Sequence, residues 1–447
     1  MSAARGGTAR SMTITLVGNL FPPVVALASG PILAQALGVA GRGEVAAATA
    51  PLGLAIALMT FGVPEAVSYA VARHPRLVRL AARNGALIVV LAGLLATAAV
   101  LLARPWLSGG DIGIQHLMAV ASLAVLPTLL LGVLRGIASG LQLWALVAWE
   151  KVLASGLRLL VLVPLWLTDH LTPFTATVVL AAMPVMGAIA YLVLPRRLPE
   201  AAPDDDGGLA STKALTGYGL RLWIGTISGI LLSRIDQTLM TPLSSAYELG
   251  LYVVAVNVSE LPLVIHRAVR DVTFVTDAHR SEDARLAAAA RISTLICAVV
   301  ALGLGVTMAW WLPALFGADF AGAVPVAWLL LVAVLVSTPG SIAGAGLSAR
   351  GRPGLRSLAL VVACVVNIGL LVLLVPVWGA MGAAVATLVG YVISSALNEV
   401  LLGRLFGVRM RDFHGVRRSD LVTLRDYGRS LVRGLGRRLR PRRRSRA

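Results

Sequence analysis

The sequence predicts an all-α, polytopic membrane protein with twelve transmembrane helices in two six-helix lobes. Three observations lead to this class. Hydrophobic residues make up 57% of the 447-residue chain and charged residues only 13%, and the mean hydropathy of +0.84 excludes a soluble protein of this length. The apolar residues fall into twelve runs of transmembrane length. The longest polar interruption divides these runs six and six.

Each expected span follows from the thickness of a bilayer, which requires about 20 apolar residues per helix. A short basic leader, residues 1–10, precedes an apolar run that is too long for a signal peptide and lacks a clear cleavage site after it, so this run is expected to be the first span. The twelve expected spans are residues 11–37, 43–71, 84–103, 114–139, 142–167, 173–194, 216–241, 248–275, 287–312, 322–348, 355–376 and 380–403. Asn19, Pro22 and Pro23 predict a kink within the first of them.

Basic residues predict the orientation, because Arg and Lys close to helix ends stay on the cytoplasmic side. Loops rich in basic residues alternate with loops that carry acids or few charges, such as those around Asp111 and Asp169. The basic residues of the inner loops are Arg73, Arg76, Arg79, Arg83, Arg196, Arg197, Lys213, Arg280, Arg285, Arg291, Arg350, Arg352 and Arg356. Both termini are therefore expected on the cytoplasmic side of the cell membrane.

The polar interruption at residues 196–213 is expected to be a cytoplasmic linker between an N-terminal lobe, residues 11–195, and a C-terminal lobe, residues 214–405. Residues 231–255 and residues 34–48 have a common plan, in which an apolar helix ends in a short turn and a Glu lies at the start of the next helix. Because each lobe contains an even number of helices, the repeat is predicted to be parallel, with its axis along the membrane normal. Chance similarity among Gly/Ala-rich helices is the alternative.

Charged residues within the predicted spans are the candidates for function, because a charge at the centre of a membrane helix costs about 2.5–3.5 kcal/mol even on a mild insertion scale. They favour a water-filled cavity. Glu260, Arg267 and Asp271 recur on one face of their helix. The other intramembrane charges considered are Glu65, Glu150, Lys151, Arg158, Arg221, Arg234, Asp236 and Arg270.

Plain structural explanations exist for several of these charges. Arg267 and Asp271 are spaced to neutralise each other on the helix surface, while Arg221 and Arg270 lie close enough to the inner face for their side chains to reach water. Glu65 and Glu260 are candidates for binding a coupling proton or cation, against the alternative of an ion pair. The two cysteines, Cys297 and Cys364, fall in apolar runs and are expected to act as small core residues.

Several short motifs are spread over nearly the whole membrane portion of the chain. They are Ala34-Gln35-Ala36-Leu37-Gly38 with Gly41-Arg42-Gly43-Glu44, Arg234-Ile235-Asp236-Gln237 with Glu248-Leu249-Gly250-Leu251-Tyr252, Gly351-Arg352-Pro353, Asn367, and the run Pro376-Val377-Trp378-Gly379-Ala380-Met381-Gly382-Ala383-Ala384. No one of them is specific alone. In their order and spacing they resemble a known family, the Wzx-type polysaccharide-biosynthesis branch of the MOP exporter superfamily.

This resemblance implies two lobes that form a V around a central cavity. It also implies flipping of a lipid-linked oligosaccharide, of the polyprenyl-pyrophosphate type, from the inner to the outer leaflet by alternating access. Arginine suits such a substrate because its planar fork binds two phosphate oxygens at once. The expected residues of the net cationic cavity are Arg158, Arg234, Asp236, Arg267 and Arg270. A glycan polymerase or glycosyltransferases are the expected protein partners.

Other functions stay open. MATE drug exporters share the twelve-helix plan, MurJ-like lipid II flippases usually have fourteen helices, and a non-transporting envelope scaffold is a further alternative. A membrane glycosyltransferase or polymerase is the enzymatic alternative, although the predicted outer loops are short. The sequence contains no phosphate-binding loop, HExxH or GxSxG motif, and its six His are not grouped at metal-ligand spacing, so no enzyme activity, cofactor or metal is expected.

The C-terminal tail, residues 406–447, has a composition of its own. Residues 409–446 contain fourteen Arg and three Asp. Leucines spaced mainly three, four or seven residues apart predict a basic amphipathic helix on the anionic lipids of the inner leaflet; they are Leu421, Leu424, Leu431, Leu435 and Leu439. Docking of an acidic protein is the alternative, and nucleic-acid binding is disfavoured.

Overall fold

A computed structural model describes residues 2–198, 207–279, 282–420, 422 and 425, and within these residues it contains helices and no strands. Eight helices of this part are long and apolar enough to cross a membrane, and the bent helix α8 (Thr212–Leu243) makes nine. The protein is therefore a multi-pass membrane protein.

The first lobe contains the helices from the N-terminus to the polar interruption of the sequence. Its elements are α1 (Ser2–Met59), α2 (Val63–Arg73), η1 (Pro75–Leu77), α3 (Val78–Leu107), α4 (Ile112–Ser122), α5 (Val125–Gly140), α6 (Trp144–Leu167), α7 (Pro173–Met186) and η2 (Gly187–Arg197). The second lobe contains η3 (Gly207–Ala210), α8, α9 (Ala246–His279), α10 (Asp283–Phe316), η4 (Ala318–Gly322), α11 (Ala323–Ala349), α12 (Pro353–Phe406) and η5 (Met410–Phe413).

Two of these elements each contain two helices that meet at a kink. The non-helical residue is Gly38 in α1 and Gly379 in α12, and both have positive φ, which glycine adopts at no steric cost. The two halves of α1 and of α12 are separate passes through the bundle. Helix α2 continues the pass begun by the second half of α1, α5 continues that of α4, and η2 continues that of α7. The described chain therefore traverses the bundle twelve times. The prediction of twelve helices is thus confirmed.

Three predicted spans are each divided between two elements, and one of them, 173–194, comprises α7 and η2. The expected span 43–71 is interrupted between α1 and α2, where Phe61 and Gly62 have positive φ and Pro64 begins a new helix without a backbone N–H. The expected span 114–139 divides into α4 and α5. Helix α1 continues through Pro22 and Pro23, and the residue that leaves helical geometry is Gly38 instead.

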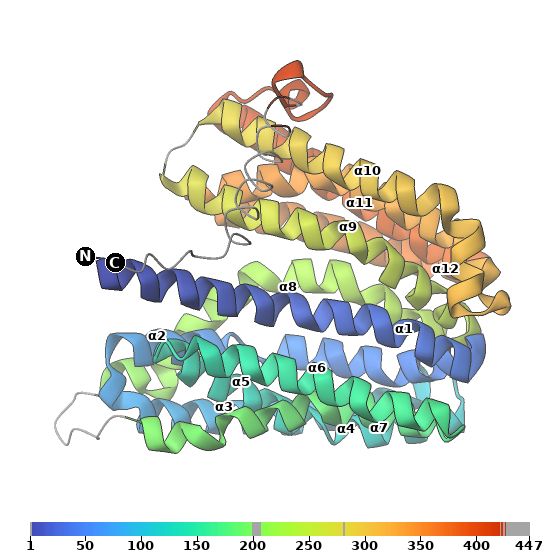
Figure 1. Ribbon diagram of the computed structural model, residues 1–447, viewed down its shortest axis with the longest axis horizontal. Coiled ribbons are helices and arrows are strands. Elements are labelled where there is room, and N and C mark those ends of the chain that lie inside the picture. Colours follow the sequence, from blue (N-terminus) through green and yellow to red (C-terminus); the bar gives the residue numbers. More distant parts are fainter. Residues whose placement is uncertain (1, 199–206, 280–281, 421, 423–424, 426–447) are drawn as a thin grey trace, which may run out of the picture.

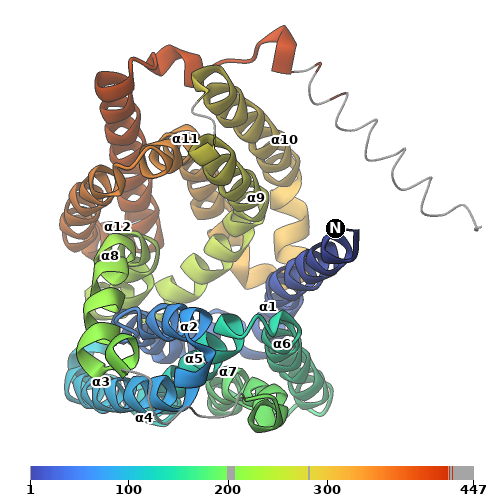
Figure 2. The ribbon, with the colours of Figure 1, turned by 90° about the vertical axis from the view of Figure 1, so that its left-hand side faces the viewer.

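The two lobes are joined at one end of the bundle (Figure 1). We call the end at which α1 begins and α12 ends the basic end, and the opposite end, with Gly38 and Gly317, the far end. One hydrophobic core draws on both lobes at the far end, for example Met118 of α4 and Phe316 of α10, whereas separate cores fill the two lobes near the basic end. Figure 2, which views the molecule from the basic end, shows the lobes as two groups of helices, with α1 and α8 at their boundary.

The segment after α12 returns to the basic end of the second lobe. Val408 and Phe413 are buried in its core. Arg291 of α10 donates to both carboxylate oxygens of Asp420, at 2.7 and 2.8 Å, and to the backbone carbonyl of Asp412. The predicted amphipathic helix depends on leucines that lie outside the described residues. Cys297 and Cys364 are free and buried, as expected.

Candidate functional site: arginine-lined cavities at the lobe boundary

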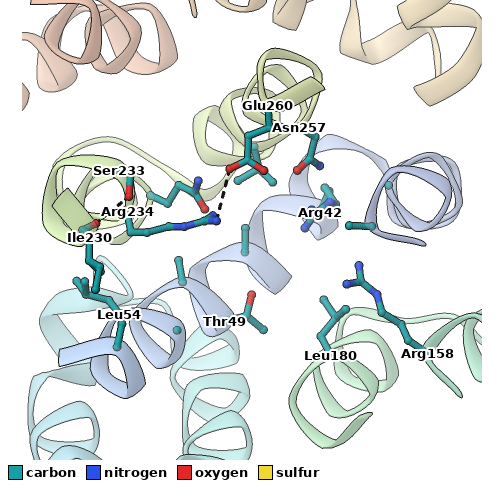
Figure 3. Close-up of a pocket in the computed structure, with 18 residues that line it drawn as sticks. Arg42, Thr49, Leu54, Arg158, Leu180, Ile230, Ser233, Arg234, Asn257 and Glu260 are labelled. Atoms are coloured by element: carbon teal, nitrogen blue, oxygen red, sulfur yellow. Dashed lines mark hydrogen bonds and ion pairs between the residues drawn. The ribbon is translucent and has the colours of Figure 1, made fainter. Parts of the chain in front are cut away.

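A cavity of about 650 Å³ lies between the lobes, lined by α1, α6 and α7 of the first lobe and by α8 and α9 of the second (Figure 3). We call it the inter-lobe cavity. Small residues of α1 form much of one wall; they are Ala26, Gly30, Ala46, Ala50, Gly53 and Ala57. Such side chains leave the wall smooth and leave the charged residues of the lining accessible to a ligand.

Arg42 reaches this cavity because α1 reverses at Gly38, one turn earlier. The side chain is buried, with 7% of its surface exposed, and its Nε has no hydrogen-bond partner among the described residues. Arg158 of α6 lines the same space, and its buried Nε also has no partner there. Figure 3 shows the two guanidinium groups in the same part of the cavity. Unpaired cations held in this way are groups that an anion would stabilise.

The second lobe contributes the remaining charges. Arg234 of α8 and Glu260 of α9 form an ion pair of 3.4 Å across the cavity wall (Figure 3). Both side chains stay accessible, with 49% and 36% of their surfaces exposed, so the pair is free to exchange partners. Among the described residues of the lining, Glu260 is the only carboxylate, against the three guanidinium groups of Arg42, Arg158 and Arg234. The inter-lobe cavity is therefore net positive.

Arg267 and Arg270 line a second cavity of about 450 Å³ within the second lobe, which we call the lobe-2 cavity. Its walls come from α8, α9, α11 and α12, and Arg356 of α12 is its third arginine. The two cavities are neighbours, because Ile230 and Ser233 line both. The five substrate-binding residues expected from the sequence are thus divided between two cavities, apart from Asp236.

Asp236 lines neither cavity. Its carboxylate is buried and accepts hydrogen bonds from the Tyr252 hydroxyl, at 2.5 Å, and from the backbone N–H of Gln237. The Tyr252 hydroxyl also lies 3.1 Å from the Thr387 hydroxyl of α12. The contacts place Asp236 in the packing between α8, α9 and α12.

Two other charged residues also lie away from the cavities. Glu65 is exposed on the first turn of α2 and lines neither cavity. Glu150 of α6 is buried inside the first lobe, where Arg135 binds both of its oxygens, at 2.9 and 2.6 Å, and Tyr191 donates to one of them. Glu150 is therefore an internal partner of the first lobe.

Sequence reasoning missed Arg42 and Arg356 as cavity residues because each lies at the end of a predicted span and was counted as a loop residue. For Arg42 the flanking glycines Gly41 and Gly43 were a usable signal, because they permit a close approach of helices around an arginine. In the described part of the chain no group of three or more His, Cys, Asp or Glu side chains is placed to hold a metal ion.

Comparison with solved structures defines the fold. An inward-facing multidrug resistance MATE family transporter of the MOP superfamily aligns with a TM-score of 0.61 and 15% identity, over 88% of this chain and 94% of the other. A MOP superfamily transporter from Pyrococcus furiosus aligns with a TM-score of 0.60 and 15% identity, over 89% and 94%. The lipid II flippase MurJ, in an inward closed conformation, aligns with a TM-score of 0.67 and 12% identity, over 90% and 89%.

The chain therefore shares the fold of these transporters and of the flippase, and its own fold has a cavity between two helical lobes. A sequence model of the polysaccharide biosynthesis protein family matches residues 8–274, which is more than half of the chain. The chain therefore belongs to this family, and the resemblance noted in the sequence is confirmed. No curated protein matches the sequence.

Proposed function

We propose that the protein flips a lipid-linked oligosaccharide with a diphosphate bridge across the cell membrane by alternating access. The observation that carries the proposal is the charge of the inter-lobe cavity, where the described lining residues include Arg42, Arg158 and Arg234 and one carboxylate, Glu260. A diphosphate diester carries about two negative charges and offers several acceptor oxygens to guanidinium groups. Membership of the polysaccharide biosynthesis family supports a glycan as the remainder of the substrate.

The arrangement of the arginines suggests how binding is coupled to movement. Arg42 and Arg158 belong to the first lobe and Arg234 to the second, so an anion bound between them is attracted by both lobes at once. In the empty cavity the like charges oppose closure of the lobes. A bound diphosphate removes this repulsion and shifts the equilibrium toward a closed state, from which the cavity opens on the other side.

The direction of transport follows from orientation. The basic end holds the arginine-rich loops and is assigned to the cytoplasm by the distribution of basic residues. With the lobes joined at the far end, the state described here receives substrate from the leaflet at the basic end. Glu260, one of the two residues predicted to bind a coupling ion, lines the cavity. When Arg234 leaves its ion pair with Glu260 to bind the substrate, the Glu260 carboxylate becomes able to bind a proton or cation.

The test is a flipping assay in proteoliposomes with a fluorescent polyprenyl-diphosphate oligosaccharide. Arg158→Gln is expected to reduce flipping at least about tenfold, because a charge-assisted hydrogen bond is lost, and Arg158→Lys to reduce it less. Arg79→Gln, which changes an exposed arginine of the basic end, serves as the control. Export of a cationic drug by the wild-type protein, with no movement of the lipid-linked glycan, would favour the MATE-type alternative and refute the proposal.

A further inference from the structure

The lobe-2 cavity contains an arrangement of polar groups that the diphosphate does not explain. Arg267 and Arg270 come from α9 and Arg356 from α12, and no carboxylate is found among the lining residues that the structure describes. Arg270 donates to Asp271 at 3.1 Å, a residue whose side chain is 70% exposed. Among the described residues, neither Arg267 nor Arg356 has a hydrogen bond or an ion pair. Two cations of this cavity are therefore free to bind an anion.

Neutral polar groups beside these arginines also have free hydrogen-bonding capacity. His266 is 2% exposed, with Nδ1 3.1 Å from the Ser293 hydroxyl and with Nε2 without a partner in the described structure. Asn398 is 3% exposed, and its Oδ1 likewise has no partner there. Buried polar atoms are rarely left unpaired, so these two atoms indicate a ligand that supplies hydrogen bonds.

Hydroxyl groups complete the lining of the lobe-2 cavity. They belong to Thr226, Ser233, Ser337, Ser341, Tyr391, Ser394 and Ser395. Hydroxyl, amide and imidazole groups around a polar space are suited to hydrogen-bond the many hydroxyls of a sugar, while arginines are suited to a carboxylate.

The two cavities follow one another along α9. Glu260 of the inter-lobe cavity and Arg267 of the lobe-2 cavity are seven residues apart on α9, which corresponds to about 10 Å along the helix axis. Together the linings hold six arginines and one carboxylate, more positive charge than a single diphosphate balances. A longer ligand with a second negative group would match both.

We infer that the lobe-2 cavity binds an acidic sugar, such as a hexuronate, in the glycan of the substrate, while the inter-lobe cavity holds the diphosphate. The inference rests on the proposed function and names the class of glycan. The carboxylate lies between Arg267 and Arg356, and the sugar hydroxyls bind His266, Asn398 and the serines of the lining. A neutral glycan would leave both guanidinium groups unpaired and would bind more weakly.

The experiment measures equilibrium binding to the full-length protein in nanodiscs with three separate probes. They are farnesyl diphosphate, tetragalacturonate as an acidic oligosaccharide, and maltotetraose as a neutral one of the same length. The wild-type protein is expected to bind tetragalacturonate at least about tenfold more tightly than maltotetraose. Arg267→Gln and Arg356→Gln are expected to weaken the binding of tetragalacturonate about tenfold or more and to change the binding of farnesyl diphosphate by no more than about twofold. Arg158→Gln is expected to weaken the binding of farnesyl diphosphate and to leave that of tetragalacturonate nearly unchanged.

Matched variants separate loss of the site from loss of the fold. Arg267→Lys and Arg356→Lys keep the charge and are expected to retain part of the tetragalacturonate binding, and Arg79→Gln is expected to bind all probes normally. Retained farnesyl diphosphate binding shows that a Gln variant is folded.

The outcomes distinguish failure of the acidic-sugar inference from failure of the proposed function. Equal binding of acidic and neutral oligosaccharides, or unchanged tetragalacturonate binding in both Gln variants, overturns the acidic-sugar inference and leaves the flippase proposal intact. If Arg267→Gln abolishes farnesyl diphosphate binding while Arg158→Gln retains it, the lobe-2 cavity holds the diphosphate, and this result overturns both the acidic-sugar inference and the assignment of the diphosphate to the inter-lobe cavity. Tetragalacturonate binding without any farnesyl diphosphate binding contradicts the diphosphate proposal alone, and binding of neither probe overturns both.

Discussion

Gly43 of α1 packs against the backbone of α9, and Gly250 of α9 packs in the same way against the backbone of α1. A Cβ atom on Gly43 would lie 1.7 Å from the carbonyl oxygen of Ala246, and one on Gly250 would lie 2.1 Å from that of Val39. Each of these carbonyls belongs to the residue four positions before the glycine of its own helix. The reciprocal contact is what a twofold repeat of the lobes produces, and it involves the two stretches whose similar sequences predicted the repeat.

Gly43→Ala and Gly250→Ala are expected to separate the lobes at the far end. The added methyl group meets rigid backbone, so the helices must move apart, at a cost of about 1–3 kcal/mol for overpacking. Thermal unfolding should shift to lower temperature, and a cysteine introduced as Val39→Cys should react faster with a membrane-impermeant maleimide. Gly303→Ala is the control, because its Cβ would enter open space. Unchanged labelling together with unchanged stability would show that the contact does not hold the far end closed.

Arg42→Met is expected to raise the thermal stability and to lower the flipping rate at least about tenfold. A buried cation without a partner destabilises the empty protein, and an apolar side chain of similar length removes that cost. The same change removes a charge that the substrate requires. Arg42→Lys should have wild-type stability and intermediate activity. If Arg42→Met instead loses stability and activity together, the arginine supports the fold rather than the substrate.

Glu150→Gln is expected to have the opposite profile. Arg135 and Tyr191 both donate to the buried Glu150 carboxylate, and loss of its charge weakens the network by about 1–3 kcal/mol. Tyr191→Phe should cost about 1 kcal/mol. Chemical denaturation in detergent measures both effects. Because Glu150 lines neither cavity, flipping below the unfolding temperature should stay near the wild-type rate; a strong loss of flipping in a stable Glu150→Gln protein would refute this assignment.

Asp420, which follows the last membrane helix, is expected to make the attachment of the C-terminal segment sensitive to acid. Hydrogen bonds from the Arg291 guanidinium hold the pKa of the Asp420 carboxyl below its ordinary value. A carboxyl with a lowered pKa in the folded state stabilises that state at neutral pH, and this stabilisation is lost as the pH falls below about 4 through the folded-state pKa. Amide exchange of residues 408–413 should therefore accelerate in acid.

In Asp420→Asn, amide exchange of residues 408–413 should be fast already at neutral pH and should increase little more in acid. Asp412→Asn is the matched control. Asp412 pairs with Arg417 through partly exposed side chains, and such a pair contributes at most about 1 kcal/mol. Slow exchange of residues 408–413 in Asp420→Asn would mean that the burial of Phe413 alone holds the segment.

Much of the fold could be predicted because a bilayer imposes simple rules on sequence. Helix number, the division into two halves and the turns at Gly38 and Gly379 follow from the lengths of apolar runs and from glycines between them. The breaks at Gly62 and after Ser122 were not predicted, because the apolar runs continue past them; Pro64 was the signal available at the first break.

The candidate site was predicted less completely. Arg158 and Arg234 both line the inter-lobe cavity, and their role in substrate binding stays a prediction. Arg267 and Arg270 lie in a neighbouring cavity, Asp236 is enclosed by Tyr252 and other packing residues, and Glu65 is exposed away from both cavities. A charged residue within a predicted membrane span indicates that its charge has a partner. The sequence does not show whether that partner is another side chain of the protein or a ligand.

By itself, the sequence of this protein determined its class and its number of membrane passes, because hydrophobic length is a local property of the chain. Only the tertiary structure decided that Arg42 and Arg356 face cavities while Glu150 is neutralised by Arg135. These assignments depend on which helix faces lie opposite each other. That relation is set by contacts between distant segments, such as Gly43 with Gly250, in which backbones approach as closely as the absence of a side chain allows.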